Sequence, residues 1–213
     1  MRDSSHPAAP TVVPARTVTY SSLRKSERTT LASATSAGPA ETTASADGSE
    51  ASSEAKSDTA DQSVLREQGI STFLGRNEGA IASWYHTNSG TDSTNGRSWC
   101  EFPYNDSVPG FAPSLKTMLS SFGDDAAKAK EGFCGLEARV YSPKTDKTLT
   151  MYIADAFDDT WVRTPSSIDV IYDSFADIFG STTDNKDDVV KACWWELTGG
   201  REEKYTYKGV GVG

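Results

Sequence analysis

Cysteine, histidine and long apolar runs are scarce in this chain of 213 residues, and each shortage excludes a class of protein. Three cysteines, Cys100, Cys134 and Cys193, are too few for a scaffold built on many disulfides, and no CxxC pair occurs. The two histidines, His6 and His86, form no cluster with cysteine, so a structural zinc site is not expected. A Gly-rich phosphate loop is also missing, and the sequence therefore predicts neither a metal nor a cofactor.

No segment approaches the roughly 18 apolar residues that a membrane-spanning helix needs, so no membrane partner is expected. The first residues, MRDSSHPAAP, have no apolar core, and no signal peptide is visible in them. A net charge of -9 argues against a nucleic-acid partner, because phosphates are bound by a surplus of Lys and Arg. The basic cluster at residues 24–28 is interpreted as solvated charge in a tail.

Large apolar residues are almost absent from residues 1–60, which consist mostly of Ser, Thr, Ala and Pro. All five Trp and all eight Phe lie after residue 70. A segment so poor in apolar groups cannot offset the entropy of ordering, so residues 1–68 are predicted to be a disordered arm. We expect one domain over residues 69–199, a tail over residues 200–213, and a monomer.

Strand patterns dominate the expected domain. Apolar and polar residues alternate over 136–142 and again over 147–153, and the turn formers PKTD separate the two runs. These runs are typical of a hairpin with one buried face. Strand formers also fill AIASWY at 80–85 and KACWWEL at 191–197.

Helix signals are fewer. Residues 61–75 are compatible with a short helix, and residues 112–122 carry apolar side chains at helix spacing. Residues 166–180 place an apolar stripe from Ile168 to Phe179 and end in Gly180, a residue typical of a helix C-terminus. The pattern as a whole predicts a mainly β barrel with short helices inserted between strands.

Two aspartates stand in similar settings. Asp155 ends the apolar run TMYIAD, and Asp169 lies in SIDV, just before or at the start of the apolar stripe. Asp169 is also compatible with a helix N-cap, and Asp155 with a turn-capping aspartate. By themselves these residues do not distinguish a structural role from a catalytic one.

The order of motifs resembles the six-stranded double-psi β-barrel of expansins, loosenins and rare-lipoprotein-A (barwin-like) domains. IASWYHTNSGTDSTNG is similar to the opening of those domains, and GFCGLEARVYSPKTDKTLTMYIAD to their central hairpin. SIDVIYDSF is similar to their IDLS segment, and VVKACWWEL to the closing strand. The resemblance spans residues 77–199, and the Ser/Thr-rich arm before it is typical of secreted fungal members.

The resemblance implies a groove with two aspartates, which hydrolytic members use as acid and base. Asp169 matches the acid-like residue and Asp155 the groove aspartate, whereas the usual position of the base holds His86. Ser167 and Ile168 replace the His-Phe of plant expansins, while an aromatic residue two positions after the first aspartate is kept as Phe157. His86 is also compatible with a loop histidine that makes one backbone hydrogen bond.

Aromatic residues near the aspartates are candidates for stacking on sugar rings. Trp84 and Tyr85 are adjacent in a strand, so one is expected in the core and the other facing out. Trp161, in the loop between the two aspartates, and Phe157 are further candidates. For Trp84, Tyr85 and Trp161, core packing is the alternative interpretation.

Three functions follow from the resemblance and remain open. The first is a secreted, expansin-like protein that binds a wall polysaccharide such as cellulose or chitin and loosens glycan contacts without hydrolysis. The second is a glycan-cleaving enzyme, an endoglucanase or a lytic transglycosylase. The third is a protease inhibitor or effector on the same barrel.

The resemblance also implies a Cys100–Cys134 disulfide, because NGRSWC and GFCG occupy the places of the paired family cysteines. Glu137 stands where the family has the partner of the last-strand cysteine, so Cys193 is expected to be a buried free thiol. A disulfide implies an oxidising compartment, and hence an extracellular or cell-wall location.

Overall fold

The computed structural model of the protein describes residues 62–209. The arm predicted for residues 1–68 therefore lies almost wholly outside the described residues, as do residues 210–213. In the part that is described, the secondary structure is mainly β, with short helices. No helix in that part is long and apolar enough to cross a bilayer.

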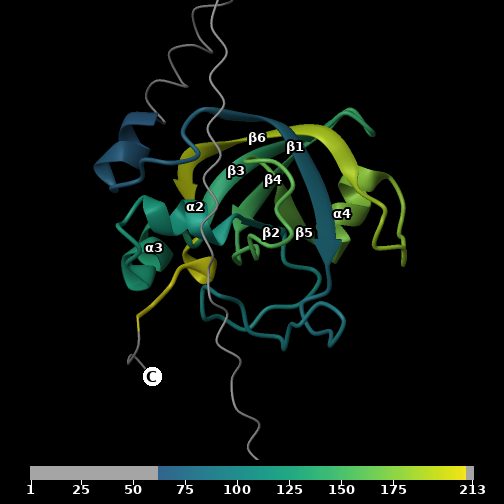
Figure 1. Cartoon of the computed structure of the whole chain (residues 1–213), viewed down its shortest axis with the longest axis horizontal. Coiled ribbons are helices and arrows are strands. Elements are labelled where there is room, and N and C mark those ends of the chain that lie inside the picture. Colours follow the sequence, from purple (N-terminus) through teal and green to yellow (C-terminus); the bar gives the residue numbers. More distant parts are fainter. Residues whose placement is uncertain (1–61, 210–213) are drawn as a thin grey trace, which may run out of the picture. The chain divides into compact units, whose positions relative to one another are not determined.

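Six strands close into a barrel. They are β1 (Arg76–Tyr85), β2 (Gly110–Pro113), β3 (Leu136–Ser142), β4 (Lys147–Ile153), β5 (Ile168–Ile171) and β6 (Val190–Arg201). Neighbours around the barrel run β1-β5-β2-β4-β3-β6 (Figure 1). The pairs β1·β5 and β2·β4 are parallel, and the other four pairs are antiparallel. Two parallel pairs in a closed six-stranded barrel make the double-psi arrangement, so the predicted fold class is confirmed.

The alternation in β3 and β4 decides which side chains fill the barrel. Leu136, Ala138 and Val140 are fully buried, and Met151 and Ile153 meet them from β4. The antiparallel register of β3 and β4 confirms the predicted hairpin. Because side chains alternate between the two faces of a strand, the polar residues in between point outward.

The centre of the barrel is aromatic. The fully buried ring of Trp195 lies 5.0 Å from the ring of Phe73 and 5.4 Å from that of Phe111. Its indole N–H donates to the carbonyl oxygen of Ser166 at 2.8 Å, so the one polar atom of the side chain is satisfied. Removing a ring of this size from water contributes about 3 kcal/mol to folding.

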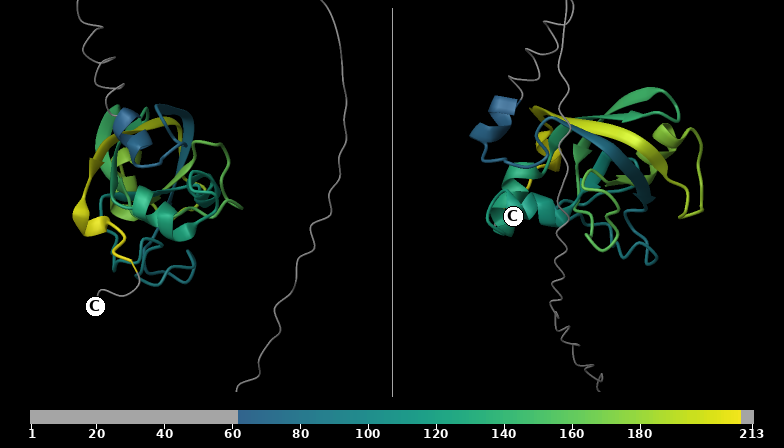
Figure 2. Two further views of the ribbon diagram at one scale, coloured as in Figure 1. Left: turned by 90° about the vertical axis from the view of Figure 1, so that its left-hand side faces the viewer. Right: turned by 45° about the horizontal axis from the view of Figure 1, so that its top comes forward.

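Helices close the ends of the barrel (Figures 1 and 2). They are α2 (Leu115–Ser120), α3 (Ala126–Phe133), α4 (Tyr172–Phe179), the 3₁₀ helix η1 (Glu203–Tyr205), and a helical turn over residues 62–67. α2 and α3 pack together at one end, and α4 contacts β1 and β5 at the other. α4 ends as predicted at Gly180, whose φ of 90° is readily adopted only by glycine.

The structure corrects the prediction for residues 166–180. Ile168–Ile171 is strand β5, and the helix begins only at Tyr172. Asp169 therefore lies inside a strand, and the helix-cap interpretation of this residue is wrong. The N-cap of α4 is Ile171, which makes no side-chain capping bond.

The fold also extends past the predicted domain boundaries. Leu65 is fully buried and Tyr205 nearly so, although they precede residue 69 and follow residue 199. Two elements, β2 and α3, had no counterpart among the predicted ones. Both matter for the site, because β2 pairs with β5 and α3 leads into Cys134.

Candidate functional site

Outward-pointing side chains of β1, β5 and the segment after β4 form a polar face on the barrel. Trp84 of β1 enters the main core, so its neighbours Ser83 and Tyr85 point to the other side. Asp169 of β5 is paired with Ser83 in the parallel ladder and lies on that same side. Asp155, two residues after the end of β4, is joined to this side by the hydroxyl of Tyr85 at 3.5 Å. Ser83, Tyr85, Asp155 and Asp169 are called the Asp169 face below.

Asp169 is a partly buried carboxyl with a single hydrogen-bond donor among the described residues. The hydroxyl of Ser83 donates to its Oδ1 at 2.7 Å. Burial raises the pKa of Asp169 to about 7, and the nearby charges of Asp92 and Asp155 add to the rise. The Ser83 hydrogen bond and the positive charge of Lys186 act in the opposite direction on this pKa. Asp169 can therefore both donate and accept a hydrogen bond near neutral pH.

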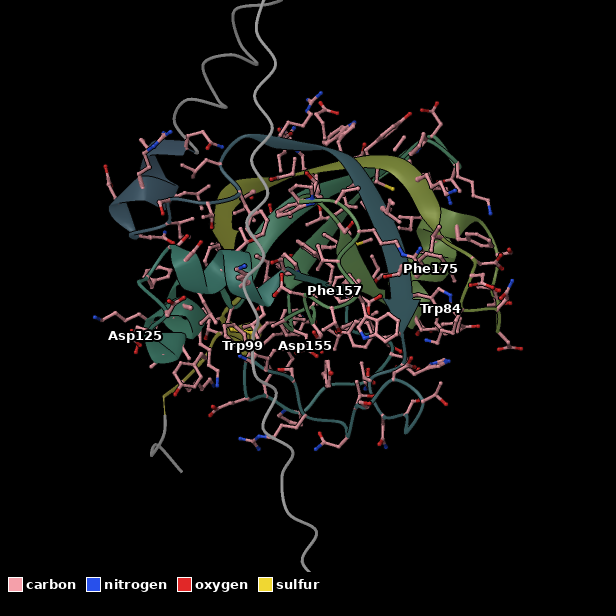
Figure 3. All side chains as sticks on the ribbon, in the orientation of Figure 1. Trp84, Trp99, Asp125, Asp155, Phe157 and Phe175 are labelled. Atoms are coloured by element: carbon pink, nitrogen blue, oxygen red, sulfur yellow. A yellow bond between two sulfur atoms is a disulfide. The ribbon has the colours of Figure 1, made fainter. Side chains whose placement is uncertain are left out.

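Asp155 has quite different surroundings, because it accepts several hydrogen bonds. The backbone N–H groups of Trp99 and Ala156 donate to Oδ1 at 2.8 and 2.9 Å. The hydroxyl of Tyr104 donates to Oδ2 at 2.5 Å, and that of Tyr85 lies 3.5 Å away. Burial raises the pKa of Asp155, and these hydrogen bonds oppose the rise. Figure 3 shows Asp155 beside Trp99, which comes from the long segment after β1.

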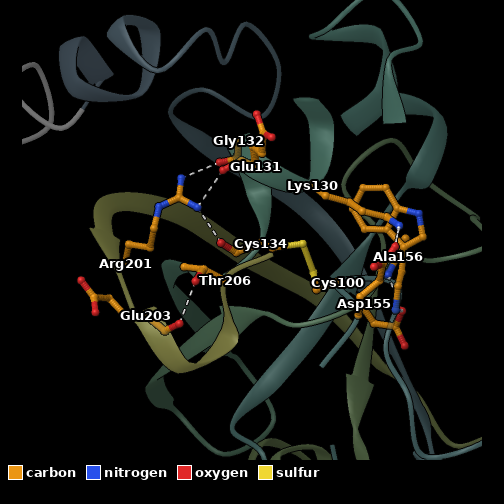
Figure 4. Close-up of a disulfide and its surroundings, with 12 residues drawn as sticks. Cys100, Lys130, Glu131, Gly132, Cys134, Asp155, Ala156, Arg201, Glu203 and Thr206 are labelled. Atoms are coloured by element: carbon orange, nitrogen blue, oxygen red, sulfur yellow. Dashed lines mark hydrogen bonds and ion pairs between the residues drawn. A yellow bond between two sulfur atoms is a disulfide. The ribbon is translucent and has the colours of Figure 1, made fainter. Parts of the chain in front are cut away.

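That segment, residues 86–109, is folded over the outer side of the barrel. Its Tyr104 packs with Tyr85, Ala154 and Ile171 in a second apolar cluster, separate from the main core. A disulfide links Cys100 to Cys134, with the two Cα atoms 5.7 Å apart, and confirms the predicted pairing (Figure 4). Asp155 therefore binds Trp99, and the disulfide binds the next residue, Cys100, so both hold the same part of the segment.

His86 is not held by the two predicted aspartates. Its Nδ1 lies 2.6 Å from Oδ2 of Asp106, and its ring packs 4.3 Å from Tyr172 and 5.4 Å from Trp84. His86 and Asp106 line a depression of about 610 Å³, and neither predicted aspartate is among the residues that line it. The structure thus places Asp155 and Asp169 on one side of the barrel, whereas His86 lies with Asp106 in a depression that neither aspartate lines.

Trp84 and Tyr85 do point to opposite sides, but both are only 5% exposed. Trp84 packs against Phe175 and Tyr172 near α4, and Tyr85 is covered by residues 86–109. The expectation that one of the two faces solvent is therefore wrong. The reason is that residues 86–109 cover Tyr85, so this outward-pointing strand residue is buried.

Trp161, by contrast, is 68% exposed. Two hydrogen bonds order its loop. The Trp161 N–H donates to the carbonyl of Asp158 at 3.0 Å and closes a turn, and the Ser114 hydroxyl donates to Asp159 at 2.5 Å and ties that turn to the start of α2. The half-buried Phe157 anchors the start of the loop, because its N–H and carbonyl both bond the backbone at residues 113–115. Trp161 is therefore a candidate contact residue, presented to solvent on a hydrogen-bonded loop.

Four polar residues that contact the predicted site residues escaped sequence reasoning: Asp92, Tyr104, Asp106 and Lys186. Each contacts a residue that is distant in the sequence. Lys186, for example, lies 2.5 Å from Asp92. Only the abundance of Asp, Asn and Ser after β1 hinted at a hydrogen-bonded loop. No short-range pattern marks these pairs.

Cys193 is a buried free thiol, as predicted. Burial raises its pKa to about 11, and its Sγ lies 3.6 Å from the carbonyl of Val190. The thiolate needed for nucleophilic chemistry is therefore scarce at neutral pH.

No protein-family model matches the chain, and no curated protein matches it significantly. Among solved structures, the chain is similar to the apo expansin of Clavibacter michiganensis, with 17% identity and a TM-score of 0.37, over 58% of this chain and 50% of that one. A mutant of that expansin in complex with cellohexaose gives 16% identity, a TM-score of 0.37 and the same coverage. The Streptomyces papain inhibitor gives 16% identity and a TM-score of 0.39, over 59% of this chain and 96% of that one. The matched part thus spans half the length of the expansin chain and nearly the whole inhibitor.

Proposed function

We propose that this protein binds a wall polysaccharide through Asp169 and Trp161, and loosens glycan contacts without cleaving them. The observation that carries the proposal is the tryptophan, 68% exposed on a fastened loop that runs from Asp155 towards Asp169. A flat aromatic ring can stack on the apolar face of a sugar, and a pre-ordered loop reduces the entropy lost on binding. Asp169 would supply the polar contact, because a partly protonated carboxyl can exchange hydrogen bonds with sugar hydroxyls.

The surroundings of the carboxylates favour binding over hydrolysis. Glycoside hydrolysis needs one carboxyl as acid and a second carboxylate free to activate water or to attack. Asp155 is occupied by two backbone N–H groups and the Tyr104 hydroxyl. Asp92 is engaged with Lys186. Neither carboxylate is free to serve as the base beside Asp169.

The disulfide supports a location outside the reducing cytosol. The Cys100–Cys134 bond closes a long loop. Bonds of this kind persist in oxidising compartments and are rare where glutathione and thioredoxin keep thiols reduced. A secreted or wall-associated protein is the proposal that fits this chemistry.

The test is a pull-down on insoluble cellulose, chitin and peptidoglycan, with a parallel assay for released reducing sugars. We expect the wild type to be depleted by at least one glycan and to release no sugar. Trp161→Ala should weaken binding about tenfold because the stacking surface is lost, and Trp161→Phe should keep most of it. Val64→Ala is the matched control, because Val64 is the other exposed large apolar residue of the described part.

Two outcomes would redirect the assignment. Sugar release that disappears in Asp169→Asn would favour the hydrolytic alternative. Failure to bind any of the glycans, together with inhibition of a cysteine protease, would favour the inhibitor alternative.

A further inference from the structure

We propose that Asn105 is an acceptor for an N-linked glycan. The chain has five asparagines, and only Asn105 has a serine or threonine two positions later, because Asp106 and Ser107 follow it. The pattern N-x-S/T, with x not proline, is the one that N-glycosylation requires, and it is used on surface loops of exported proteins. The inference rests on the export in the proposed function, and is independent of the polysaccharide and of the face that binds it.

Asn105 begins an exposed turn in the segment 86–109. Its carbonyl oxygen accepts the backbone N–H of Val108 at 3.1 Å, so residues 105–108 form a turn. Its side-chain Oδ1 accepts the N–H of Ser107 at 3.0 Å, as is typical of an asparagine at the start of a turn. Within residues 62–209 the side-chain Nδ2 makes no hydrogen bond. The amide thus uses its oxygen to order the turn, and the nitrogen to which a sugar is attached is free.

The residues on either side hold the turn in place without using the Asn105 side chain. Tyr104 is 7% exposed and packs in the second apolar cluster. Asp106 accepts the backbone N–H of Thr87 at 2.7 Å and lies 2.6 Å from the His86 ring nitrogen. A sugar chain on Asn105 would therefore project from a fixed turn and would break none of these bonds.

The surroundings of Asn105 have room for a sugar and are polar. Asn105 lines the depression of about 610 Å³ that also contains His86 and Asp106. The remaining lining side chains carry hydroxyl or amide groups, and they are Thr87, Asn88, Ser89 and Ser107. Such groups can exchange hydrogen bonds with the hydroxyl groups of a sugar. The first sugar would therefore begin at the edge of a polar depression and would cover no apolar surface.

The modification is a glycosyl transfer without a change of oxidation state. The Asn105 Nδ2 forms a bond to the anomeric carbon of an oligosaccharide that is supplied on a lipid diphosphate. The bond between that carbon and the diphosphate oxygen breaks, Nδ2 loses one proton, and the lipid diphosphate leaves. The transfer takes place in an oxidising export pathway, which is the setting that favours the Cys100–Cys134 bond.

Asn88 and Asn95 provide an internal comparison. Both are exposed and lie in the same segment as Asn105. The second residue after Asn88 is Gly90, and the second after Asn95 is Arg97, so neither asparagine has the required hydroxyl residue. If exposure alone were sufficient, all three would be modified, whereas the proposal restricts the sugar to Asn105.

The experiment expresses the full chain in yeast or insect cells behind a host leader, so that entry into the export pathway is supplied by the host signal. Intact masses are compared before and after treatment with peptide N-glycosidase, which does not release sugars from Ser or Thr. We expect the wild type to lose the mass of an oligosaccharide, with Asn105 deamidated to aspartate in the peptide map. Asn105→Gln and Ser107→Ala should abolish this loss completely, and Ser107→Thr and the matched control Asn95→Gln should keep it.

Absence of the sugar in both Asn105→Gln and Ser107→Ala supports the proposal, because the second variant keeps the asparagine and breaks only the pattern. Disulfide mapping of each variant checks that the Cys100–Cys134 bond, and with it the fold, is retained. A secreted wild type without N-linked sugar, or a sugar that persists in Asn105→Gln, would overturn the proposal. The measurement uses no polysaccharide, so its failure leaves the proposed binding standing, and a failed pull-down leaves the modification standing.

Discussion

Asp155 and Asp169 are aspartates on the same side of one barrel, and burial raises the pKa of both. Their neighbourhoods nevertheless differ. Asp155 accepts two backbone N–H groups and a tyrosine hydroxyl, and so holds the segment 86–109 against the barrel. Asp169 accepts one hydrogen bond from the hydroxyl of its ladder partner and, within residues 62–209, bonds no other segment. Residue type and burial are thus insufficient to assign a role, and the number and origin of the donors separate a fastening carboxylate from a candidate contact residue.

The largest effect is expected on the Asp155 side, where the disulfide reinforces the same segment. Replacing both Cys100 and Cys134 with Ser should lower the free energy of unfolding by roughly 3 to 4 kcal/mol, because the open chain regains the entropy of a loop with a sequence separation of 34. Urea unfolding measures this change. Wild-type protein treated with a reductant is the control, and a loss below about 1 kcal/mol would contradict the role given to the bond.

The aspartates themselves provide a matched pair of substitutions. Asp155→Ala leaves the Trp99 N–H and the Tyr104 hydroxyl without their acceptor, and we expect it to cost about 3 kcal/mol. Asp169→Ala removes the Ser83 hydrogen bond together with a carboxyl whose ionised form is disfavoured by burial, so it should cost less than about 1 kcal/mol. The comparison is made by urea unfolding at pH 7. Equal losses of unfolding free energy would mean that the two carboxyls contribute equally to stability, which would contradict the comparison.

A smaller effect is expected from pH. The folded pKa of Asp169 is raised to about 7, above the unfolded value near 4, so its contribution to stability is complete below about pH 4 and is lost as the pH rises through 7. Asp169→Asn keeps the shape without the charge and should remove this loss. The variant should therefore be more stable than the wild type at pH 8, by roughly 2 kcal/mol, which is about half the full linkage value because Asp169 is partly exposed, and it should gain little at pH 4.

Urea unfolding across pH 4 to 8 provides the measurement, and the difference between variant and wild type isolates Asp169 from other titrating groups. Parallel profiles for the two proteins would show that the carboxyl titrates normally. Asp155 shifts in the same direction, so part of the wild-type slope should remain in the variant.

Local sequence patterns were sufficient to predict those strands of the barrel that are long and bury only one face. The alternation in β3 and β4 predicted both strands and their pairing, and Gly180 predicted the end of α4. β2 has four residues, all buried, so it has no alternation to detect. In α3 the only buried residues are Ala129, Gly132 and Phe133, too weak a stripe to be noticed, although Asp125 is an ordinary N-cap.

Long-range geometry decided the parts that were mispredicted. Ile168 and Ile171 fit a helical stripe with Phe175, and only the pairing with β1 and β2 makes Ile168–Ile171 a strand. Tyr85 is buried because Tyr104 folds over it, which no local pattern in the β1 segment encodes. The Asp92–Lys186 pair likewise joins two loops that are distant in sequence. The sequence therefore located the candidate site by its aspartates but not by the polar groups around them.

The free thiol has a consequence for how the chain matures. Three cysteines allow three different single pairings, and only Cys100–Cys134 occurs in the folded protein. Cys193 escapes mispairing because strand β6 places it, fully buried, between β1 and β3. If oxidation precedes the docking of this strand, the nascent chain has an accessible third thiol that competes for either partner. Early docking of the last strand therefore protects the Cys100–Cys134 pairing, because it buries the competing thiol.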